Sequence, residues 1–458
     1  MKSSIIPGKN ELDINNNFEL IVAGGGTAGV VAAIAAARSG VKVLIVEQFG
    51  SLGGSATNGL VTPFMHTHID GNPMCSSISD EINNKMLEIG YGAVDGSNNK
   101  GHFDPLMLKF VLEDMAVEAG VNILYYTYIC DVIMEDQTIK GLIVENKAGR
   151  SAITASRVID CTGDGDLAYK AGVPFEKGSP DTGKNQPMSV RYIMSGVDIY
   201  KFTEFMNNCG ANYCYVPPFF HTAMLWDRNF PLEPVFKKAL DAGEITYEDG
   251  AYWQVFGIPG RPGSLAFNCP EIFEGVDGTN PYDLTNAQIT GKKAIMRYLK
   301  FYKKYFPGFE NSYITEVAIQ VGIRETRRIK GIYELTDEDV ILCRKFDDYI
   351  AKSNYPVDIH GYNLRNKHID MNGKDSIPYY EIPYRCLVPI NIKSLLIAGR
   401  CISATFTAQS SLRIQPTVRA IGEAAGIAAA ISISKNIEFA EIDGQEVRKE
   451  MLKRGAIF

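Results

Sequence analysis

The residues of this sequence best suited to chemistry begin with a glycine-rich turn, in which Gly24, Gly26 and Gly29 have the spacing GxGxxG. An apolar run precedes the turn and an alanine-rich run follows it, which predicts a strand, a tight turn and a helix. The first glycine permits the bend, the second lets a pyrophosphate approach the backbone, and the third allows close helix–strand packing. The free N–H groups of the first helical turn, at Thr27 and Ala28, can then bind phosphate oxygens.

A carboxylate stands where this kind of turn needs one. A second apolar run over 42–46 follows the helix, and Glu47 comes directly after it, 18 residues past Gly29. A carboxylate there accepts hydrogen bonds from both ribose hydroxyls and repels a 2′-phosphate. The stretch therefore predicts a βαβ unit that binds an adenine dinucleotide, with Gln48 counted in the same site. A generic α/β turn with a coincidental glutamate is the competing interpretation.

A second glycine-rich loop over 48–58 favours a flavin over a nicotinamide cofactor. It contains Gly53, Gly54 and Ser55, where an NAD dehydrogenase normally proceeds into another βα unit. Small residues suit a long cofactor whose ribityl chain passes over the backbone. A flexible surface loop is the alternative interpretation. We therefore expect FAD.

The elements that must position these loops are spread along the chain. Further buried strands are predicted at 157–161 and 395–399, a hairpin over 129–144, and a small-residue helix from 416 to 434. Between about 175 and 385 the βα alternation stops and prolines and aromatics increase. The predicted class is α/β, with a Rossmann-like FAD-binding domain built from discontinuous segments and an inserted mixed α+β substrate domain. The expected boundaries are 18–60, 105–175 and 387–434 for the FAD-binding domain, 61–104 and 176–386 for the substrate or cap domain, and 435–458 for a C-terminal tail.

Composition and charge narrow the classes of function. The net charge of the 458 residues is −7 and no basic run exceeds a pair, so nucleic-acid binding is not expected. The nine cysteines are scattered and never form a CxxC pair, which is typical of a reducing compartment. The apolar stretch 18–37 contains Glu19 and four glycines, so it is read neither as a membrane span nor as a signal peptide. We expect a cytoplasmic protein.

Several separated blocks add a family resemblance to these observations. Besides the two glycine loops, the blocks lie at 158–166, 322–329, 382–387, 398–403 and 415–417. Together they resemble the FAD-dependent oxidoreductases of glutathione-reductase-type fold, and more narrowly the broad bacterial family often labelled xanthan lyase. The resemblance covers about residues 18–434. Members of that family act on unrelated substrates, so it implies a cofactor and a fold but no particular reaction.

The resemblance implies FAD contacts beyond the glycine loops. The strand residue whose backbone touches adenine corresponds to Ile129 or Cys130. Thr162 and Gly163 match a block that usually reads Ala-Thr-Gly, with Cys161 in place of the alanine. A small side chain is kept at that position.

The last part of the chain is implied to reach the flavin itself. Gly399 and Arg400 stand where many relatives have Gly-Asp, so the usual aspartate contact to the ribityl chain is missing. Gln415, Pro416 and Thr417 open the last predicted helix, and proline in a first turn costs no needed N–H. The resemblance points this helix N-terminus at the flavin N1–C2=O edge, where negative charge gathers on reduction. A core helix without a functional tip is the alternative.

Candidate substrate-binding residues lie in the middle of the chain. Arg324 follows an apolar alternation over 317–323 that predicts a strand, and its planar fork suits a carboxylate or paired hydroxyls. Pairing with Glu325 or Glu316 is the competing, structural interpretation.

Tyr384 and Arg385 come just before the chain returns to the FAD-binding domain, where a crevice between domains is expected. His221, in an aromatic run, is a candidate base, although a single histidine there is more often structural. His66 and His68 lack a third ligand, so no metal is predicted.

The expected function is exchange of a hydride between a small polar molecule and flavin N5, by a dehydrogenase or oxidase. A flavin-dependent C=C reductase is one alternative, and an FAD-binding electron-transfer or structural subunit without its own substrate is another. No second dinucleotide fingerprint is found, so NAD(P)H is not expected as a tightly bound cofactor. The electron acceptor and self-association into a homo-oligomer stay open.

We predict that the purified protein is yellow and releases FAD, not FMN or NAD, when it is denatured. The reason is the combination of the glycine turn, Glu47 and the 53–55 loop. Chromatography of the released cofactor checks this. Colourless protein that cannot be reconstituted with FAD would contradict it.

Overall fold

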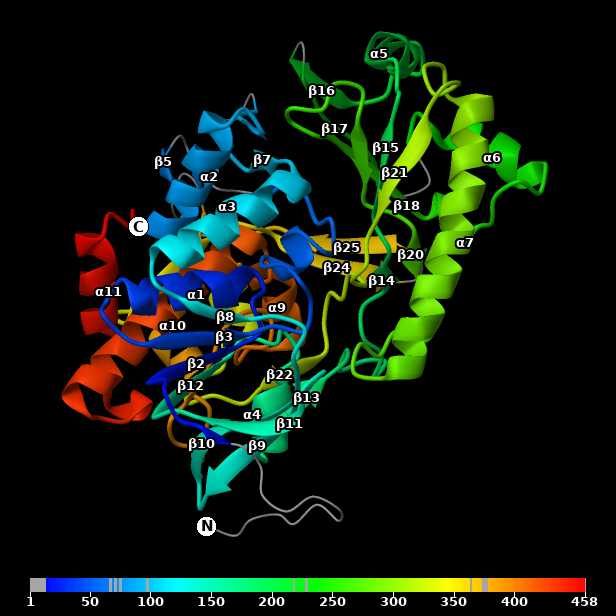
Figure 1. Ribbon diagram of the computed structural model, residues 1–458. Helices are drawn as coiled ribbons and strands as arrows, with labels where there is room; N and C mark the ends of the chain where they lie inside the picture. The colour runs from blue at the N-terminus through cyan, green and yellow to red at the C-terminus, as the bar shows by residue number, and fades with distance from the viewer. Residues whose placement is uncertain are drawn as a thin grey trace.

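A parallel sheet lies at the centre of the computed structural model (Figure 1), which describes residues 14–65, 68–69, 72–73, 76–95, 99–216, 219–226, 230–362, 365–372 and 378–457. Its strand order is β27-β12-β2-β3-β8, and every neighbouring pair is parallel. The strands are β2 (Leu20–Ala23), β3 (Val43–Val46), β8 (Asn122–Leu124), β12 (Arg157–Asp160) and β27 (Leu395–Ile397). Outside β8, all of these strand residues are buried, as strands covered on both faces must be. The expected α/β class, with a Rossmann-like sheet drawn from separated segments, is confirmed.

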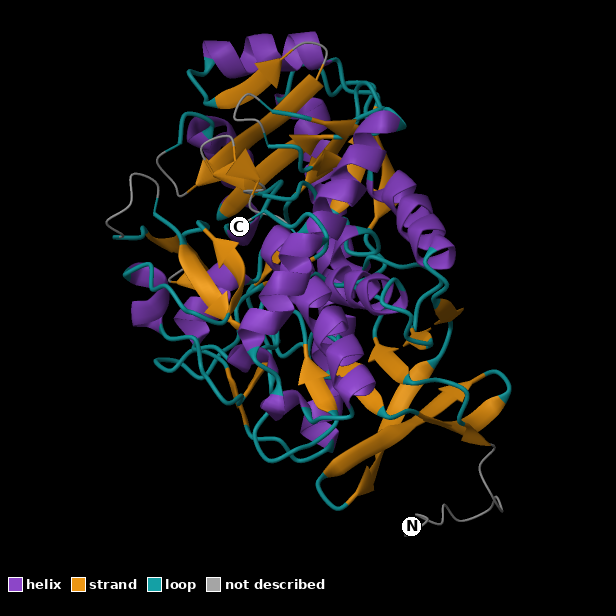
Figure 2. Ribbon diagram, turned by 90° about the vertical axis from the view of Figure 1, so that its left-hand side faces the viewer, coloured by secondary structure: helices purple, strands orange, loops and turns teal. Residues whose placement is uncertain are grey.

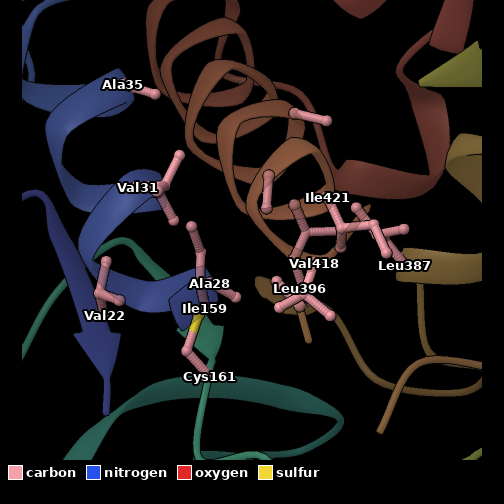
Figure 3. Close-up of a cluster of buried hydrophobic side chains, with 14 of the residues drawn as sticks. Val22, Ala28, Val31, Ala35, Ile159, Cys161, Leu387, Leu396, Val418 and Ile421 are labelled. Atoms are coloured by element: carbon pink, nitrogen blue, oxygen red, sulfur yellow. The ribbon is translucent and has the colours of Figure 1, made fainter. Parts of the chain in front are cut away.

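Two helices rich in small residues lie side by side on one face of this sheet. They are α1 (Thr27–Ala37) and α10 (Gln415–Lys435), with α2 (Ser77–Glu88) and α3 (Pro105–Glu118) beside α1. A Cβ on Gly422 would lie 2.3 Å from the Ala28 carbonyl oxygen, and one on Gly426 would lie 2.1 Å from that of Ala32. Figure 3 shows side chains of the two helices in one buried cluster. Glycine at these two positions is what allows the close contact.

Among the described helices, α10 is the one long and apolar enough to cross a membrane by length and composition, but 83% of its most apolar window is buried inside the protein. That degree of burial is typical of a core helix.

A four-stranded sheet covers the other face of the parallel sheet. Its order is β1-β11-β10-β9, and β10 packs against β12. The strands are β1 (Ile14–Asn15), β9 (Tyr128–Glu135), β10 (Thr138–Asn146) and β11 (Gly149–Thr154). The hairpin expected over 129–144 is therefore confirmed, with Asp136 in its turn at a φ of +52°.

A second hydrophobic core forms around an antiparallel sheet with the order β16-β17-β18-β19-β15-β21. In Figure 2 this sheet and the four-stranded sheet lie toward opposite ends of the molecule, with the parallel sheet and its helices between them. The strands are β15 (Tyr192–Ser195), β16 (Tyr213–Val216), β17 (Phe219–Trp226), β18 (Tyr252–Gly257), β19 (Leu265–Phe267) and β21 (Tyr313–Val317). The helices are α5 (Ile199–Asn208), α6 (Glu233–Asp241) and α7 (Pro281–Tyr305). Stacked aromatic rings fill the space, for example Tyr192 on Phe267 at 4.8 Å between centroids.

Shorter helices and strand pairs complete the fold. The helices are α4 (Asp166–Lys170), α8 (Asp337–Ile341), α9 (Phe406–Leu412) and α11 (Gly444–Lys453), with 3-10 turns at Gly54–Ala56, Glu248–Gly250, Tyr384–Leu387 and Phe439–Glu441. The strand pairs are β4 (His68–Ile69) with β5 (Asn72–Pro73), β6 (Gly92–Ala93) with β7 (His102–Phe103), β13 (Phe175–Lys177) with β22 (Arg327–Ile329), β14 (Met188–Ser189) with β20 (Glu271–Ile272), β23 (Tyr349–Ser353) with β26 (Tyr380–Pro383), and β24 (Val357–Tyr362) with β25 (Arg365–Ile369).

The two hydrophobic cores divide the chain differently from the expected domain boundaries. The first core contains Ile82 of α2 and Ile350 of β23, both from segments that the sequence places in the cap. It also contains Met451 of α11, which the sequence places in a tail. The second core draws only on described residues between 188 and 321. The buried core of the inserted unit thus spans less of the chain than 176–386, and the domain boundaries themselves stay a prediction.

We predict that Gly426→Ala destabilises the protein, although alanine normally stabilises a helix interior by about 0.5–1 kcal/mol relative to glycine. The added Cβ would meet the Ala32 carbonyl oxygen of α1, so α1 and α10 must separate, at a cost of about 1–3 kcal/mol. Denaturant unfolding of the FAD-loaded protein measures the change. Ser434→Ala, at an exposed position of the same helix, is the control and should stay within about 0.5 kcal/mol. A Gly426→Ala protein as stable as the wild type would show that the contact is not close.

Candidate functional site

A cavity of about 280 Å³ lies between the parallel sheet and the second core. At one end its wall is the pair of glycine loops and the start of α10. At the other end its wall is polar and comes from the second core, the loop after β21, the strand β24 and the end of α9. We call these the dinucleotide end and the polar end.

The glycine turn at the dinucleotide end has the geometry that its sequence predicts. Gly24 has a φ of +94°, and a Cβ on Gly29 would lie 1.9 Å from the Gly24 carbonyl oxygen. A Cβ on Gly26, by contrast, would meet only the Gly54 Cα, at 4.0 Å. Gly26 faces the cavity, and no side chain caps the helix that begins after it at Thr27. The space over Gly26 and the uncapped N–H groups beside it suit a pyrophosphate.

Glu47 braces this turn from the end of β3. Its two carboxylate oxygens accept hydrogen bonds from the N–H groups of Gly25 (2.7 Å) and Phe49 (2.8 Å). Burial raises the pKa of Glu47, and the two N–H groups offset part of that rise. Each oxygen keeps a further lone pair, so the carboxylate can still accept from ribose hydroxyls. The neighbouring Gln48 is exposed.

The second glycine loop lies directly against the first. The N–H of Gly53 donates to the Gly25 carbonyl (2.8 Å), and a Cβ on Gly54 would lie 2.8 Å from the Gly26 Cα. Gly53 and Gly54 both have positive φ, +98° and +51°. Ser55 lines the cavity with its hydroxyl 3.4 Å from that of Thr27. The two loops predicted to hold the cofactor therefore form one continuous wall.

The carboxyl ends of β12 and β27 supply the next part of the wall. Thr162 and Gly163 line the cavity, and the Thr162 hydroxyl donates to Asp160 (2.7 Å). Arg400 also lines it, but its guanidinium pairs with Asp164 at 2.8 Å. A Cβ on Gly163 would lie 3.2 Å from that guanidinium, so arginine occupies the space beside this turn. Next to it, Gly399 has a φ of +117°.

The start of α10 closes the dinucleotide end. The Gln415 side chain donates to the Val61 carbonyl (2.7 Å) and accepts from the Thr27 hydroxyl (3.4 Å). Pro416 is in the first turn, as expected, and Thr417 is buried behind it. Only Gln415 of these three lines the cavity.

Ile129 and Cys130 lie near the start of β9 and do not line the cavity. The N–H of Thr127 donates to the Glu47 carbonyl at 3.1 Å, which brings the start of β9 to the end of β3. The adenine contact implied for this strand remains a prediction.

A chain of ion pairs forms the polar end. Arg324 pairs with Glu271 (2.8 Å), and the Glu271 carboxylate also faces His360 Nδ1 (2.6 Å). His360 Nε2 faces Asp358 (3.0 Å), which also pairs with Arg413 (3.7 Å) and accepts from the Tyr355 hydroxyl (3.3 Å). Burial tends to raise the pKa of Glu271, but the charge of Arg324 and the His360 ring outweigh it, so the pKa lies below its usual value.

A hydrogen-bonded group of neutral side chains continues this wall. The Tyr252 hydroxyl donates to Gln254 Oε1 (2.6 Å) and accepts from Asn268 Nδ2 (2.7 Å), and all three residues line the cavity. Burial raises the pKa of Tyr252, as do the charges of Asp358 and Glu271, so its hydroxyl stays protonated at neutral pH.

Of the predicted substrate residues, Arg324 lines the cavity, but it does not follow a strand. β21 ends at Val317, and 318–326 is irregular apart from one bridge between Gly322 and Ser189. Of the alternating apolar residues, Val317, Val321 and Ile323 contact the second core. Ile319 is exposed. The partner of Arg324 is Glu271, not Glu325 or Glu316.

Tyr384 and Arg385 are not part of the cavity wall, so the prediction that placed them at the crevice is wrong. The Tyr384 hydroxyl is buried and donates to the Phe439 carbonyl at 3.0 Å, on the side of the C-terminal helix. Arg385 is exposed and pairs with Asp348 (2.9 Å). Both lie in a 3-10 turn that packs against α11 and not toward the second core.

The side chains of His221 and His68, and all of His66, lie outside the described residues. Among the residues that are described, no cluster of three or more His, Cys, Asp or Glu could hold a metal ion.

Sequence reasoning missed most of the polar end. It is lined by Arg191, Tyr252, Gln254, Asn268, His360 and Arg413, which come from several elements of the fold, and of these only Tyr252 and Gln254 share one, the strand β18. A local signal exists for two pairs, Asp358 with His360 on β24 and Tyr252 with Gln254 on β18, because alternate residues of a strand lie on one face.

A glycine-walled dinucleotide cradle that opens into a polar cavity is typical of FAD-binding enzymes. The chain belongs to the FAD dependent oxidoreductase family, whose model matches residues 19–451. The predicted FAD and oxidoreductase class are thereby confirmed. The glutathione-reductase-type fold and the narrower family labelled xanthan lyase remain predictions.

The curated relatives match only part of this chain. A thiamine thiazole synthase of Aeropyrum pernix is 32% identical over 38% of this chain and 63% of its own length. One from Methanococcus aeolicus is 29% identical over 35% and 60%. A digeranylgeranylglycerophospholipid reductase 1 of Methanococcoides burtonii is 24% identical over 41% and 47%. The chain thus spans less than two thirds of each of these relatives.

Solved structures resemble the chain over nearly its whole length at low identity. A geranylgeranyl bacteriochlorophyll reductase-like protein from Thermoplasma acidophilum has a TM-score of 0.46 and 14% identity, covering 96% of this chain and 84% of that one. The L-proline dehydrogenase from P. horikoshii has a TM-score of 0.43 and 14% identity, covering 97% and 100%.

We predict that Gly26→Val abolishes FAD binding without unfolding the protein. The valine side chain would extend into the space over the turn, where the protein itself offers only the Gly54 Cα at 4.0 Å. FAD content, read from absorbance, and far-ultraviolet circular dichroism measure the two effects. Gly250→Val is the control, since a Cβ there would meet only Phe236 at 3.8 Å, away from the cavity. Full flavin occupancy in Gly26→Val would show that the pyrophosphate lies elsewhere.

Proposed function

We propose that this protein is an FAD-dependent dehydrogenase or oxidase of a small polar molecule. The observation that carries the proposal is the single cavity that joins the dinucleotide end to the polar end. FAD, when bound, supplies a flavin N5 that accepts a hydride from a substrate C–H. The residues of the polar end would hold the substrate beside it.

The residues of the polar end are suited to binding and orientation. Tyr252, Gln254 and Asn268 are fixed to one another, so their remaining donors and acceptors are preorganised for a hydroxyl or amine. His360 is held between Glu271 and Asp358, which prevents its ring from turning. A substrate here displaces water from groups that are already in place.

The two alternative functions fit this wall less well. A digeranylgeranylglycerophospholipid reductase is among the relatives, and its name favours a C=C reductase. Charged residues such as Arg324 and Asp358 at the cavity wall are, however, a poor environment for a long apolar chain. A structural or electron-transfer subunit would have no use for a buried cavity with ionic groups beside its cofactor.

We predict that a small hydroxy acid, amino acid or polyol bleaches the flavin of the holoprotein under anaerobic conditions. The polar wall orients such molecules, whereas the described part of the chain has only one parallel sheet for a dinucleotide. NADH and NADPH should therefore bleach it slowly. Stopped-flow absorbance at the flavin bands measures the rates. Rapid, saturable reduction by either nucleotide, or reoxidation of reduced flavin by an enoate alone, would contradict the proposal.

Two tyrosine variants test whether the cavity wall acts in flavin reduction, one in the wall and one as a matched control outside it. Tyr252→Phe removes a hydroxyl from the cavity wall, so reduction by the substrate should slow by about tenfold or more while FAD content is kept. Tyr302→Phe removes an equally buried hydroxyl, bonded to Trp253 and Tyr192, that is not in the wall. Its reduction rate should not change.

A further inference from the structure

Arg191 differs from the other arginines of the cavity wall. It lies between β14 and β15, and its Nη1 donates to the Thr62 carbonyl at 3.3 Å. Its Nε is buried and has no hydrogen-bond partner among the described residues. The ionisable groups that act most on its charge are Tyr252, Arg324, Cys269 and Tyr355, none of which is a carboxylate.

Each of the other arginines in the described wall has an acidic partner. Arg324 pairs with Glu271 at 2.8 Å, Arg400 with Asp164 at 2.8 Å and Arg413 with Asp358 at 3.7 Å. The two carboxylates at the polar end are thus already shared by Arg324, Arg413 and His360. Within the described part of the chain, nothing anionic remains for Arg191.

An unpaired guanidinium out of water is costly, because its hydration is lost without a compensating partner. Burial lowers the pKa of Arg191 to about 10, and Arg324 contributes to that fall. The side chain nevertheless remains charged at neutral pH. Arg191 is half-buried, and a cation at a cavity wall without an acidic partner is suited to an anion that arrives with a ligand.

Two anions could be the partner of Arg191: the phosphates of FAD and an anionic group of the substrate. The phosphates of FAD belong at the dinucleotide end, over Gly26 and beside Gly54. The groups that act on Arg191 belong to the second core and to the segment before β24. Arg324, in the loop after β21, also acts on the charge of Arg191 and lines the same cavity.

We propose that Arg191 binds the carboxylate of the substrate, so that the substrate class is a small organic acid. This inference rests on the proposed function and narrows it. A carboxylate that enters the cavity supplies the anionic partner that the guanidinium lacks among the described residues. The rest of the substrate then lies against Tyr252 and Asn268, which line the same cavity.

The test uses carboxylates that are paired with their neutral amides. The FAD-loaded protein is titrated with acetate, 2-hydroxyisobutyrate and benzoate, and with acetamide, 2-hydroxyisobutyramide and benzamide, and binding is read from the flavin difference spectrum. None of these carboxylates has a hydroxyl- or amino-bearing C–H to oxidise, so binding is measured apart from turnover. At least one acid should bind, and its amide should bind about tenfold more weakly or worse. Binding by no acid, or equal binding by acid and amide, would overturn the proposal.

Variants at position 191 give a second measurement. Arg191→Met should keep FAD and raise the Kd of the acid about 30- to 1,000-fold, or roughly 2–4 kcal/mol at about 1.4 kcal/mol per tenfold. Arg191→Lys should recover part of the affinity, because it restores the charge but not the fork. Arg150→Met, at an exposed arginine paired with Glu145 in the four-stranded sheet, is the matched control and should leave the Kd unchanged.

The denaturation midpoint and the flavin reduction potential of Arg191→Met separate carboxylate binding from a structural role and from a role at the flavin. Removing an unpaired cation should leave the denaturation midpoint of Arg191→Met unchanged or raise it. A large fall in that midpoint would mark Arg191 as structural. A shifted flavin reduction potential with unchanged acid affinity would assign it to the flavin. Either result would overturn the proposal.

Failure of the proposed function gives a different pattern. If acids bind through Arg191 but no hydroxy acid, amino acid or polyol bleaches the flavin anaerobically, the carboxylate site stands and the dehydrogenase proposal fails. If only neutral molecules bleach the flavin, the dehydrogenase proposal stands and the carboxylate site fails.

Discussion

Close approach of backbone to backbone is the constraint on which the rest of this structure depends. Gly422 and Gly426 bring α10 against the carbonyl groups of α1, and Gly54 brings the second loop against Gly26. These contacts fix where α1 and α10 begin, and hence where their N–H groups face the cavity. Because even one methyl group at Gly426 would meet a carbonyl oxygen at 2.1 Å, the shape of the cofactor wall follows from packing under the sheet.

At the polar end the constraint is different: charged side chains that are removed from water must be paired with groups of opposite charge. Glu271 and Asp358 hold His360 between them and pair with arginines on their far sides. Such an arrangement is rigid, because moving one member leaves another buried and unpaired. The wall can therefore orient a ligand without first being ordered by it. Arg191, the one arginine of the described wall without an acidic partner, favours a ligand that carries a negative charge.

The parts of this structure that the sequence predicts are those encoded by neighbouring residues. The turn at 24–29, Glu47 after its strand and the 129–144 hairpin depend on local periodicity and glycine spacing, and the fold has them as expected. The polar end instead joins residues such as Arg191 and His360, whose approach is set by tertiary packing alone. Tyr384 was misplaced for the same reason, because proximity in sequence to the returning chain does not determine which way a 3-10 turn packs.

The pairing of β12 with β27 also has a consequence for how the protein is made. Val158 aligns with Leu395, and α10 follows only after β27, so almost the whole chain separates α1 from the helix that covers it. At about 5–20 residues per second, a ribosome needs roughly 20–80 s between the two. During that time the face of α1 that packs on α10 has no partner from its own chain, and exposed apolar surface of this kind is what chaperones bind. Flavin acquisition must therefore wait until synthesis has passed α10.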